Sequence, residues 1–142
     1  MATIAAARRV RRAPHPLHAM LLSFAFPLFL GALVSDIAYA NSYQIQWANF
    51  AAWLIAGALL FSAFAVLWAL VDVVRTKRIQ GRAGIYAMLL LAMWVIGLIN
   101  ALVHARDGWA MMPTGLVLSI VTVLLAFVAS WIGYAGSEGA EA

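Results

Sequence analysis

The residues of this chain that could carry chemistry are three histidines and two carboxylates set within or beside apolar runs. They are His15, His18, His104, Asp36 and Asp72. A histidine beside a carboxylate can accept and release a proton near neutral pH, for example at a quinol site. Two histidines on facing helices can hold a haem b. Cysteine is absent, which excludes disulfides, thiolate metal sites and iron–sulfur ligation by this chain.

The elements that must position these residues are four long apolar runs. The chain has 142 residues, of which 66% are hydrophobic and only 10% charged. The runs cover approximately residues 17–39, 50–74, 84–103 and 115–134, and each supplies the roughly 20 helical residues that a bilayer requires. The sequence therefore predicts an all-α, integral membrane four-helix bundle over residues 15–134. A basic tail, 1–14, precedes it, and a short acidic tail, 135–142, follows it.

Positive charge is concentrated beside alternate ends of these runs. Eight of the nine lysines and arginines precede the first run or lie in the link between the second and third: Arg8, Arg9, Arg11, Arg12, Arg75, Lys77, Arg78 and Arg82. The other two links contain only Arg106, beside Asp107. Because short basic loops stay cytoplasmic, we expect both termini and the middle link to lie on the inner side of a bacterial inner membrane. The same distribution accounts for the net charge of +4 without a nucleic-acid partner. The lipid bilayer is the expected partner.

Counting residues from each helix centre divides the polar residues into two groups. Toward the inner surface lie His15, His18, Asp72, Arg75 and Tyr86, and toward the outer surface lie Asp36, Asn100, His104, Arg106, Asp107 and Thr114. A carboxylate that faced lipid one turn inside a helix end would cost about 1–3 kcal/mol, so Asp36 requires a partner. Asn100, His104 or Arg106 could reach it.

Each of the two carboxylates allows a structural and a functional interpretation. For Asp36 we favour a hydrogen bond that locks two helices, and the alternative is a carboxylate–histidine pair that handles a proton. For Asp72 the partner would be Arg75 or His18, and an interfacial ion pair is the favoured interpretation. No strongly polar side chain is expected in the middle third, which argues against a continuous relay of ionisable groups across the membrane.

The positions of the histidines restrict the haem hypothesis. His18 begins the first run and His104 ends the third, so about 30 Å of bilayer should separate them. The two cannot ligate one iron within a single subunit. Histidine–methionine ligation, a symmetric dimer that pairs His18 with its twin, and a Tyr86 ligand stay open. No metal site with enough ligands on one side is predicted, and no catalytic motif is found, so we expect no enzyme activity from this chain by itself.

The first run also has features of a secretory signal. Arginines precede it, and Ala38, Tyr39 and Ala40 resemble a cleavage site. The run is about twice the usual signal length and is interrupted by Pro27 and Asp36. We therefore expect a retained helix, with cleavage after Ala40 as the alternative.

Several segments resemble the bacterial membrane family called domain of unknown function 2231. The likeness extends from His15 to Gly133. Its more specific parts are the His-Pro opening at residues 15–27 and the His-Ala-Arg-Asp-Gly-Trp stretch at 104–109. Further contributions come from residues 47–50 continuing to Asp72, from 100–103 and from 113–116. The resemblance implies a four-helix membrane domain. It also implies a redox protein partner, because relatives are fused to or encoded near Rieske-type and sugar-dehydrogenase-like proteins. Many relatives have a histidine where this chain has Tyr86.

Three functional hypotheses follow. The first is a membrane anchor or electron-transfer subunit of a redox system, linked to quinone or to haem b through His18 or His104. The second is a structural or assembly membrane protein with no chemistry of its own. The third, motivated by Pro27 and Asp36, is a small transporter subunit. Small residues on the second and fourth runs could pair two copies into a homodimer or pack one bundle internally.

Overall fold

The structure, a computed structural model, describes residues 15–77 and 81–135, and within these ranges it is helical apart from short links. The helices are α1 (Pro16–Ser42), α2 (Ile45–Thr76), α3 (Arg82–His104), the single-turn α4 (Gly108–Met111) and α5 (Thr114–Ala135). Four of them are long and apolar enough to cross a membrane. The prediction of an all-α bundle of four membrane helices is therefore confirmed. The two predicted tails, apart from residue 135, and the middle of the basic link at 78–80 lie outside the described residues.

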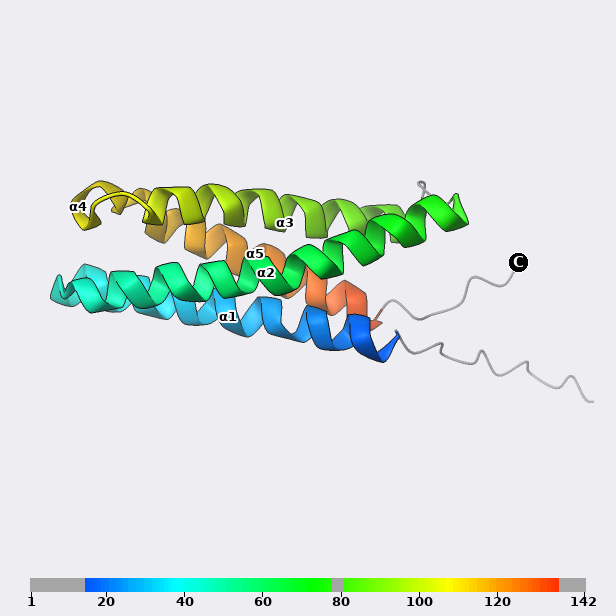
Figure 1. Cartoon of the computed structure of the whole chain (residues 1–142), viewed down its shortest axis with the longest axis horizontal. Helices are drawn as coiled ribbons and strands as arrows, with labels where there is room; N and C mark the ends of the chain where they lie inside the picture. The colour runs from blue at the N-terminus through cyan, green and yellow to red at the C-terminus, as the bar shows by residue number, and fades with distance from the viewer. Residues whose placement is uncertain (1–14, 78–80, 136–142) are drawn as a thin grey trace, which may run out of the picture.

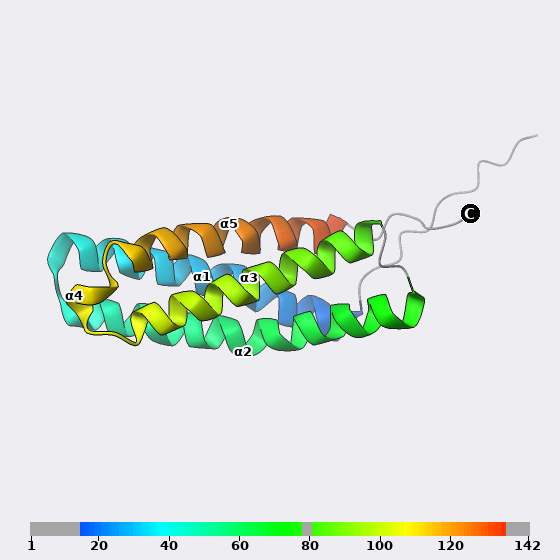
Figure 2. The same ribbon diagram turned by 90° about the horizontal axis from the view of Figure 1, so that it is seen from above.

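The four long helices run antiparallel to their sequence neighbours and form a bundle in the order α1, α2, α3, α5 (Figures 1 and 2). α1 packs against α2 and α5, and α3 also packs against α2 and α5, so α1 and α3 face each other across the bundle. We call one end of the bundle the His18 end, where α1 and α3 begin and α2 and α5 finish. The opposite end, which carries α4, is the His104 end (Figure 1).

The first two helices are longer than their apolar runs. α1 continues to Ser42 and α2 begins at Ile45, where the apolar pattern had suggested about 39 and 50. The polar residues between the runs are helical, and Asn41 and Ser42 donate side-chain hydrogen bonds to the carbonyls one turn earlier. The break occurs at Tyr43, which has a left-handed backbone (φ 55°) and donates its N–H to the Tyr39 carbonyl.

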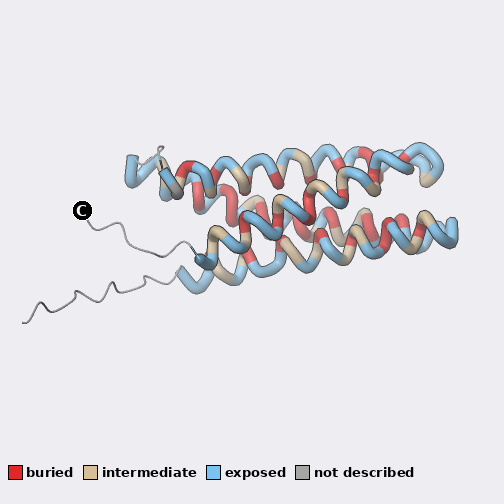
Figure 3. The backbone as a smooth tube through the Cα atoms, turned by 180° about the vertical axis from the view of Figure 1, so that it is seen from behind, coloured by how far each residue is buried: buried red, intermediate tan, exposed pale blue. Residues whose placement is uncertain are grey.

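Much of the bundle interior consists of small residues, and many of the large aliphatic side chains point outward. Buried positions recur along each helix and face the centre of the bundle (Figure 3). Many are alanine, including Ala25, Ala32, Ala51, Ala58, Ala65, Ala126 and Ala129, and the larger ones include Leu22, Phe29, Ile55, Leu90 and Met93. Small residues let membrane helices approach closely. Ala58, Ser62, Ala126 and Ala129 therefore pack within one bundle.

Candidate functional site: a polar cluster buried between three helices

Four polar side chains meet inside the bundle near the His104 end: Asp36, Asn100, His104 and Ser119. We call them the polar cluster. They come from α1, α3 and α5, and each lies at the helix end or within about two turns of it. Asp36 and Asn100 are each 0% exposed, and the His104 side chain is also fully covered. The cluster is thus placed in apolar surroundings, where every polar group needs a partner.

Hydrogen bonds join the cluster into one network. His104 Nε2 lies 2.8 Å from Asp36 Oδ1, and the Ser119 hydroxyl donates to Asp36 Oδ2 at 2.5 Å. Asn100 Nδ2 donates to Ser119 Oγ at 2.9 Å, and His104 Nδ1 lies 2.9 Å from the Asn100 backbone carbonyl. Both carboxylate oxygens of Asp36 and both ring nitrogens of His104 are therefore engaged.

These partners determine where the protons of the cluster lie. The Asn100 carbonyl can only accept, so His104 Nδ1 must carry a hydrogen. The contact between His104 Nε2 and Asp36 Oδ1 then holds one proton between two acceptors. Whether this proton is assigned to the imidazole or to the carboxyl group, the net charge of the pair is zero. A neutral pair is the state that an apolar environment favours, because an unpaired charge there is costly.

A glycine on α5 makes room for the histidine. A Cβ atom at Gly115 would lie 2.9 Å from His104 Cε1, a distance that real Cβ atoms essentially never show. At the same end, Gly108 lies so close to the Tyr39 hydroxyl that an added Cβ would be only 2.8 Å from it. Tyr39 and Met111 are buried together there with Ala48 and Val103. The link between α3 and α5 therefore covers this end of the bundle.

One acceptor of the cluster has no partner. Asn100 Oδ1 is buried and receives no hydrogen bond among the described residues, while Asn100 Nδ2 donates to Ser119. A buried amide oxygen without a donor costs about 1–3 kcal/mol. Both oxygens of Asp36 thus have hydrogen-bond partners, whereas Asn100 Oδ1 is an acceptor without a donor among the described residues.

The structure brings some predicted site residues together and leaves others apart. Asp36 and His104 are in direct contact, and Asn100 joins them through Ser119. Arg106 is exposed and is not a partner of Asp36 in the described part of the chain. Asp72 and Arg75 are both exposed, and within residues 15–77 and 81–135 no ion pair joins them or joins Asp72 to His18.

Ser119 is the cluster residue that the sequence did not single out. It was grouped with small residues that pack helices, yet its hydroxyl both donates to Asp36 and accepts from Asn100. A count of depth along α5 could have found it, because Ser119 is little more than one turn from the start of the helix, as deep as Asp36 and Asn100 are in theirs.

A second polar contact joins α1 and α3 at the His18 end. His18 Nε2 and Tyr86 Oη are hydrogen-bonded at 2.8 Å, and the Trp68 ring lies beside both His15 and His18, with ring centroids 4.9 and 5.9 Å away. His18 Nδ1 is buried and has no hydrogen-bond partner in the part of the chain that the structure describes. Tyr86 thus bonds His18 directly through its hydroxyl.

This geometry does not suit one haem held by both His18 and His104. Tyr86 is bonded to His18 and lies on the same helix as His104. At 1.5 Å per residue, Tyr86 and His104 are about 27 Å apart along α3, so His18 and His104 lie at opposite ends of the bundle. Both ring nitrogens of His104 are hydrogen-bonded. Iron would therefore have to displace Asp36 or the Asn100 carbonyl. Among the described residues no group of three or more His, Cys, Asp or Glu could hold a metal ion.

Comparison with protein families identifies the chain. The family described as predicted membrane protein (DUF2231) matches residues 14–137, nearly the whole chain, and the chain belongs to this family. No curated protein and no solved structure matches it. Membership agrees with the four apolar helices and assigns no activity.

Proposed function

We propose that this DUF2231 protein is a membrane-anchoring subunit, a rigid four-helix bundle that holds a partner protein at the membrane. The observation that carries the proposal is the closed network of the polar cluster. Asp36 has both oxygens bonded and His104 has both nitrogens bonded, to groups on α1, α3 and α5. Such a network fixes three helices relative to one another.

Other inter-helix bonds support a role in rigidity. Trp94 Nε1 donates to the Leu59 carbonyl at 3.1 Å and joins α3 to α2. The Tyr134 hydroxyl donates to the Ala19 carbonyl at 2.9 Å and joins α5 to α1. Each inter-helix hydrogen bond in a membrane contributes about 0.6–2 kcal/mol. Together with the polar cluster, these bonds connect every helix of the bundle to at least one other.

An anchor fits the arrangement better than an electron carrier or a transporter. Haem would have to break the bonds of His104 described above. Between the two polar ends, the described core consists largely of apolar side chains such as Leu22, Phe29, Leu90 and Met93, which offer no relay for a proton or ion. The partner we propose is a redox protein, the class that the family resemblance implies.

We also propose that the His18 end faces the cytoplasm of a bacterial inner membrane. The basic residues support this orientation, because eight of the nine lysines and arginines precede α1 or lie within or directly beside the link from α2 to α3. Arg106 is the single basic residue in the links at the His104 end.

The proposal is tested in the native host by deleting the protein and comparing the membrane and soluble fractions by quantitative proteomics. We expect a redox protein to move from the membrane fraction to the soluble fraction, and the full-length chain to restore it. The purified chain should show no stoichiometric haem band before or after dithionite reduction. Unchanged fractionation of all redox proteins would contradict the anchor. A one-to-one haem whose reduced α-band disappears in His18→Ala or His104→Ala would show an electron carrier instead.

A further inference from the structure

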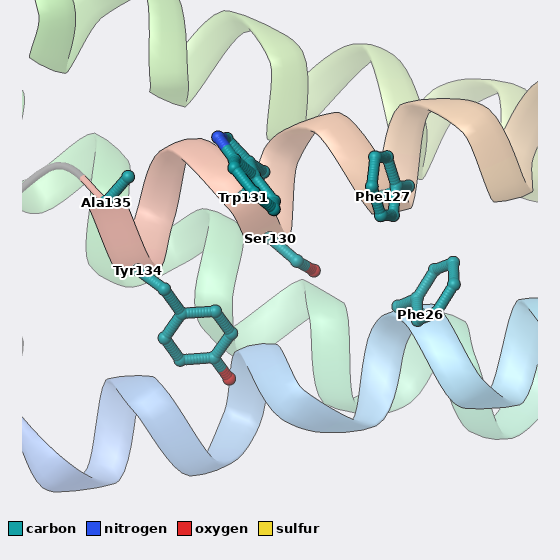
Figure 4. A pocket seen from close by; sticks show the side chains of 6 residues that line it. All are labelled: Phe26, Phe127, Ser130, Trp131, Tyr134 and Ala135. Atoms are coloured by element: carbon teal, nitrogen blue, oxygen red, sulfur yellow. The ribbon is translucent and has the colours of Figure 1, made fainter.

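A second feature, far from the polar cluster, is a groove between α1 and α5 near the His18 end. Its volume is about 420 Å³, within the range of pockets that bind small molecules. We call it the aromatic groove, and Figure 4 shows the side chains that line it: Phe26, Phe127, Ser130, Trp131, Tyr134 and Ala135. Because Trp131 is 68% exposed and Phe127 and Tyr134 are also exposed, the groove opens sideways toward lipid.

The serine in this groove behaves differently from other hydroxyls in the bundle. Ser35, Ser62 and Thr122 each donate to the carbonyl one turn earlier on their own helix. Ser130 Oγ is buried and makes no hydrogen bond with the described residues. Figure 4 shows it directed toward the space between Phe26 and Tyr134. A buried hydroxyl in a membrane span costs free energy until it meets an acceptor, so the groove suits a ligand that supplies one.

The depth of Ser130 selects among membrane-soluble ligands. Ser130 lies about 7.5 Å inside the end of α5 at Ala135, counted at 1.5 Å per residue. Helical side chains also tilt toward the helix N-terminus, which here directs the hydroxyl deeper. Phospholipid ester carbonyls lie outside the hydrocarbon core, whereas the ring carbonyl of a lipid-soluble quinone can enter it.

The lining of the groove also favours a flat ring. The ring centroids of Phe26 and Phe127 are 5.7 Å apart, and those of Phe127 and Trp131 are 6.1 Å apart. Aromatic rings at such spacing pack well against a further flat ring. The Tyr134 hydroxyl is already bonded to the Ala19 carbonyl, whereas the Ser130 hydroxyl has no acceptor among the described residues and is available to donate.

We propose that the aromatic groove binds the ring of an isoprenoid quinone, with the Ser130 hydroxyl donating to a ring carbonyl and the tail extending into the bilayer. This is a binding site and involves no electron transfer by the chain. It does not depend on the anchoring role, since the release of a partner and the binding of a quinone are measured separately.

The test measures quenching of tryptophan fluorescence in lipid nanodiscs by a 1,4-naphthoquinone that carries two isoprene units. We expect saturable quenching by wild type and about five-fold weaker binding by Ser130→Ala, the effect of one lost hydrogen bond. Ser42→Ala is the matched control, because its hydroxyl is bonded to Ala38 at the opposite end. Trp131→Phe should remove most of the saturable quenching, and Trp53→Phe, exposed on α2, should retain it.

Further measurements decide whether a carbonyl ligand occupies the groove. A naphthalene with the same tail but no carbonyls should compete about five-fold less well than the quinone in wild type, and this preference should disappear in Ser130→Ala. A photoreactive quinone should label wild type within residues 126–135 rather than at the exposed α3 face around Leu98. The proposal is overturned by non-saturable quenching that is equal in all variants, or by labelling of α3 alone. A diacyl phospholipid that displaces the quinone in a Ser130-dependent manner would overturn it too.

Discussion

At the scale of single residues, the central question is how Asp36 can lie in the bundle with no exposure. Its two oxygens meet His104 and Ser119, and the pair with His104 is neutral as a whole. The carboxylate is therefore compatible with its surroundings only while both partners remain.

Removing one partner should destabilise the bundle more than removing both. We expect His104→Ala to lower the unfolding free energy by about 2–4 kcal/mol, because it leaves Asp36 with Ser119 alone. The double variant Asp36→Asn/His104→Ala should recover part of this loss, since no carboxylate remains. Unfolding by SDS in mixed micelles measures both, with Ser42→Ala as control. Equal stability of wild type and His104→Ala would show that the contact is not stabilising.

The sequence predicted part of this cluster and not all of it. Depth along the helices brought Asp36, Asn100 and His104 to one side, and the cost of a carboxylate in lipid required a partner for Asp36. Which partner it meets depends on how α1 and α3 face each other across the bundle, which periodicity does not specify. Ser119 was missed because a serine in a membrane helix usually satisfies its own hydroxyl, as Ser35 and Ser62 do here.

At the scale of helices, close approach is set by glycines with different neighbours. An added Cβ at Gly57 on α2 would meet Leu28 Cδ1 at 3.6 Å, an ordinary contact. The same atom at Gly115 on α5 would lie 2.9 Å from a His104 ring that is held by two hydrogen bonds. Both glycines lie on long apolar helices, so the neighbouring side chains should decide how a substitution changes stability.

Alanine should therefore have opposite effects at these two positions. Gly57→Ala should raise the unfolding free energy by up to about 1 kcal/mol, because alanine has the higher helix propensity. Gly115→Ala should lower it by about 1–3 kcal/mol, since His104 must move out of its contact with Asp36. Thermal melting in one detergent compares them directly. A stabilising Gly115→Ala would mean that α5 can shift without loss of the polar cluster.

Helix boundaries show a further limit of prediction from pattern. The four apolar runs fixed the number and order of the long helices, but α1 and α2 extend into polar sequence and turn within Tyr43 and Gln44. In that extension the side chains of Asn41 and Ser42 are bonded to backbone carbonyls of their own helix, which hydropathy does not record. The single turn of α4 is short enough that no apolar period marks it.

At the scale of the whole molecule, the two ends of the bundle differ in charge and in construction. The His104 end is closed by the α3–α5 link, whose Met111 is buried against the same cluster as Tyr39, and the links at this end contain Arg106 as their one basic residue. The His18 end bears Arg75 and Lys77, both exposed on the last turn of α2 or directly after it. If positive charge directs insertion, this asymmetry predicts a single orientation in the membrane.

The absence of cysteine makes that orientation directly measurable, since any introduced thiol is the only one in the chain. Trp109→Cys and Thr76→Cys place a thiol at exposed positions on the His104 and His18 ends. A membrane-impermeant maleimide should label Trp109→Cys in intact spheroplasts and Thr76→Cys only in inverted vesicles. Leu60→Cys, exposed in the middle of α2, should react from neither side because lipid covers it. The reverse pattern would place the basic end outside, and charge would then not determine how this bundle inserts.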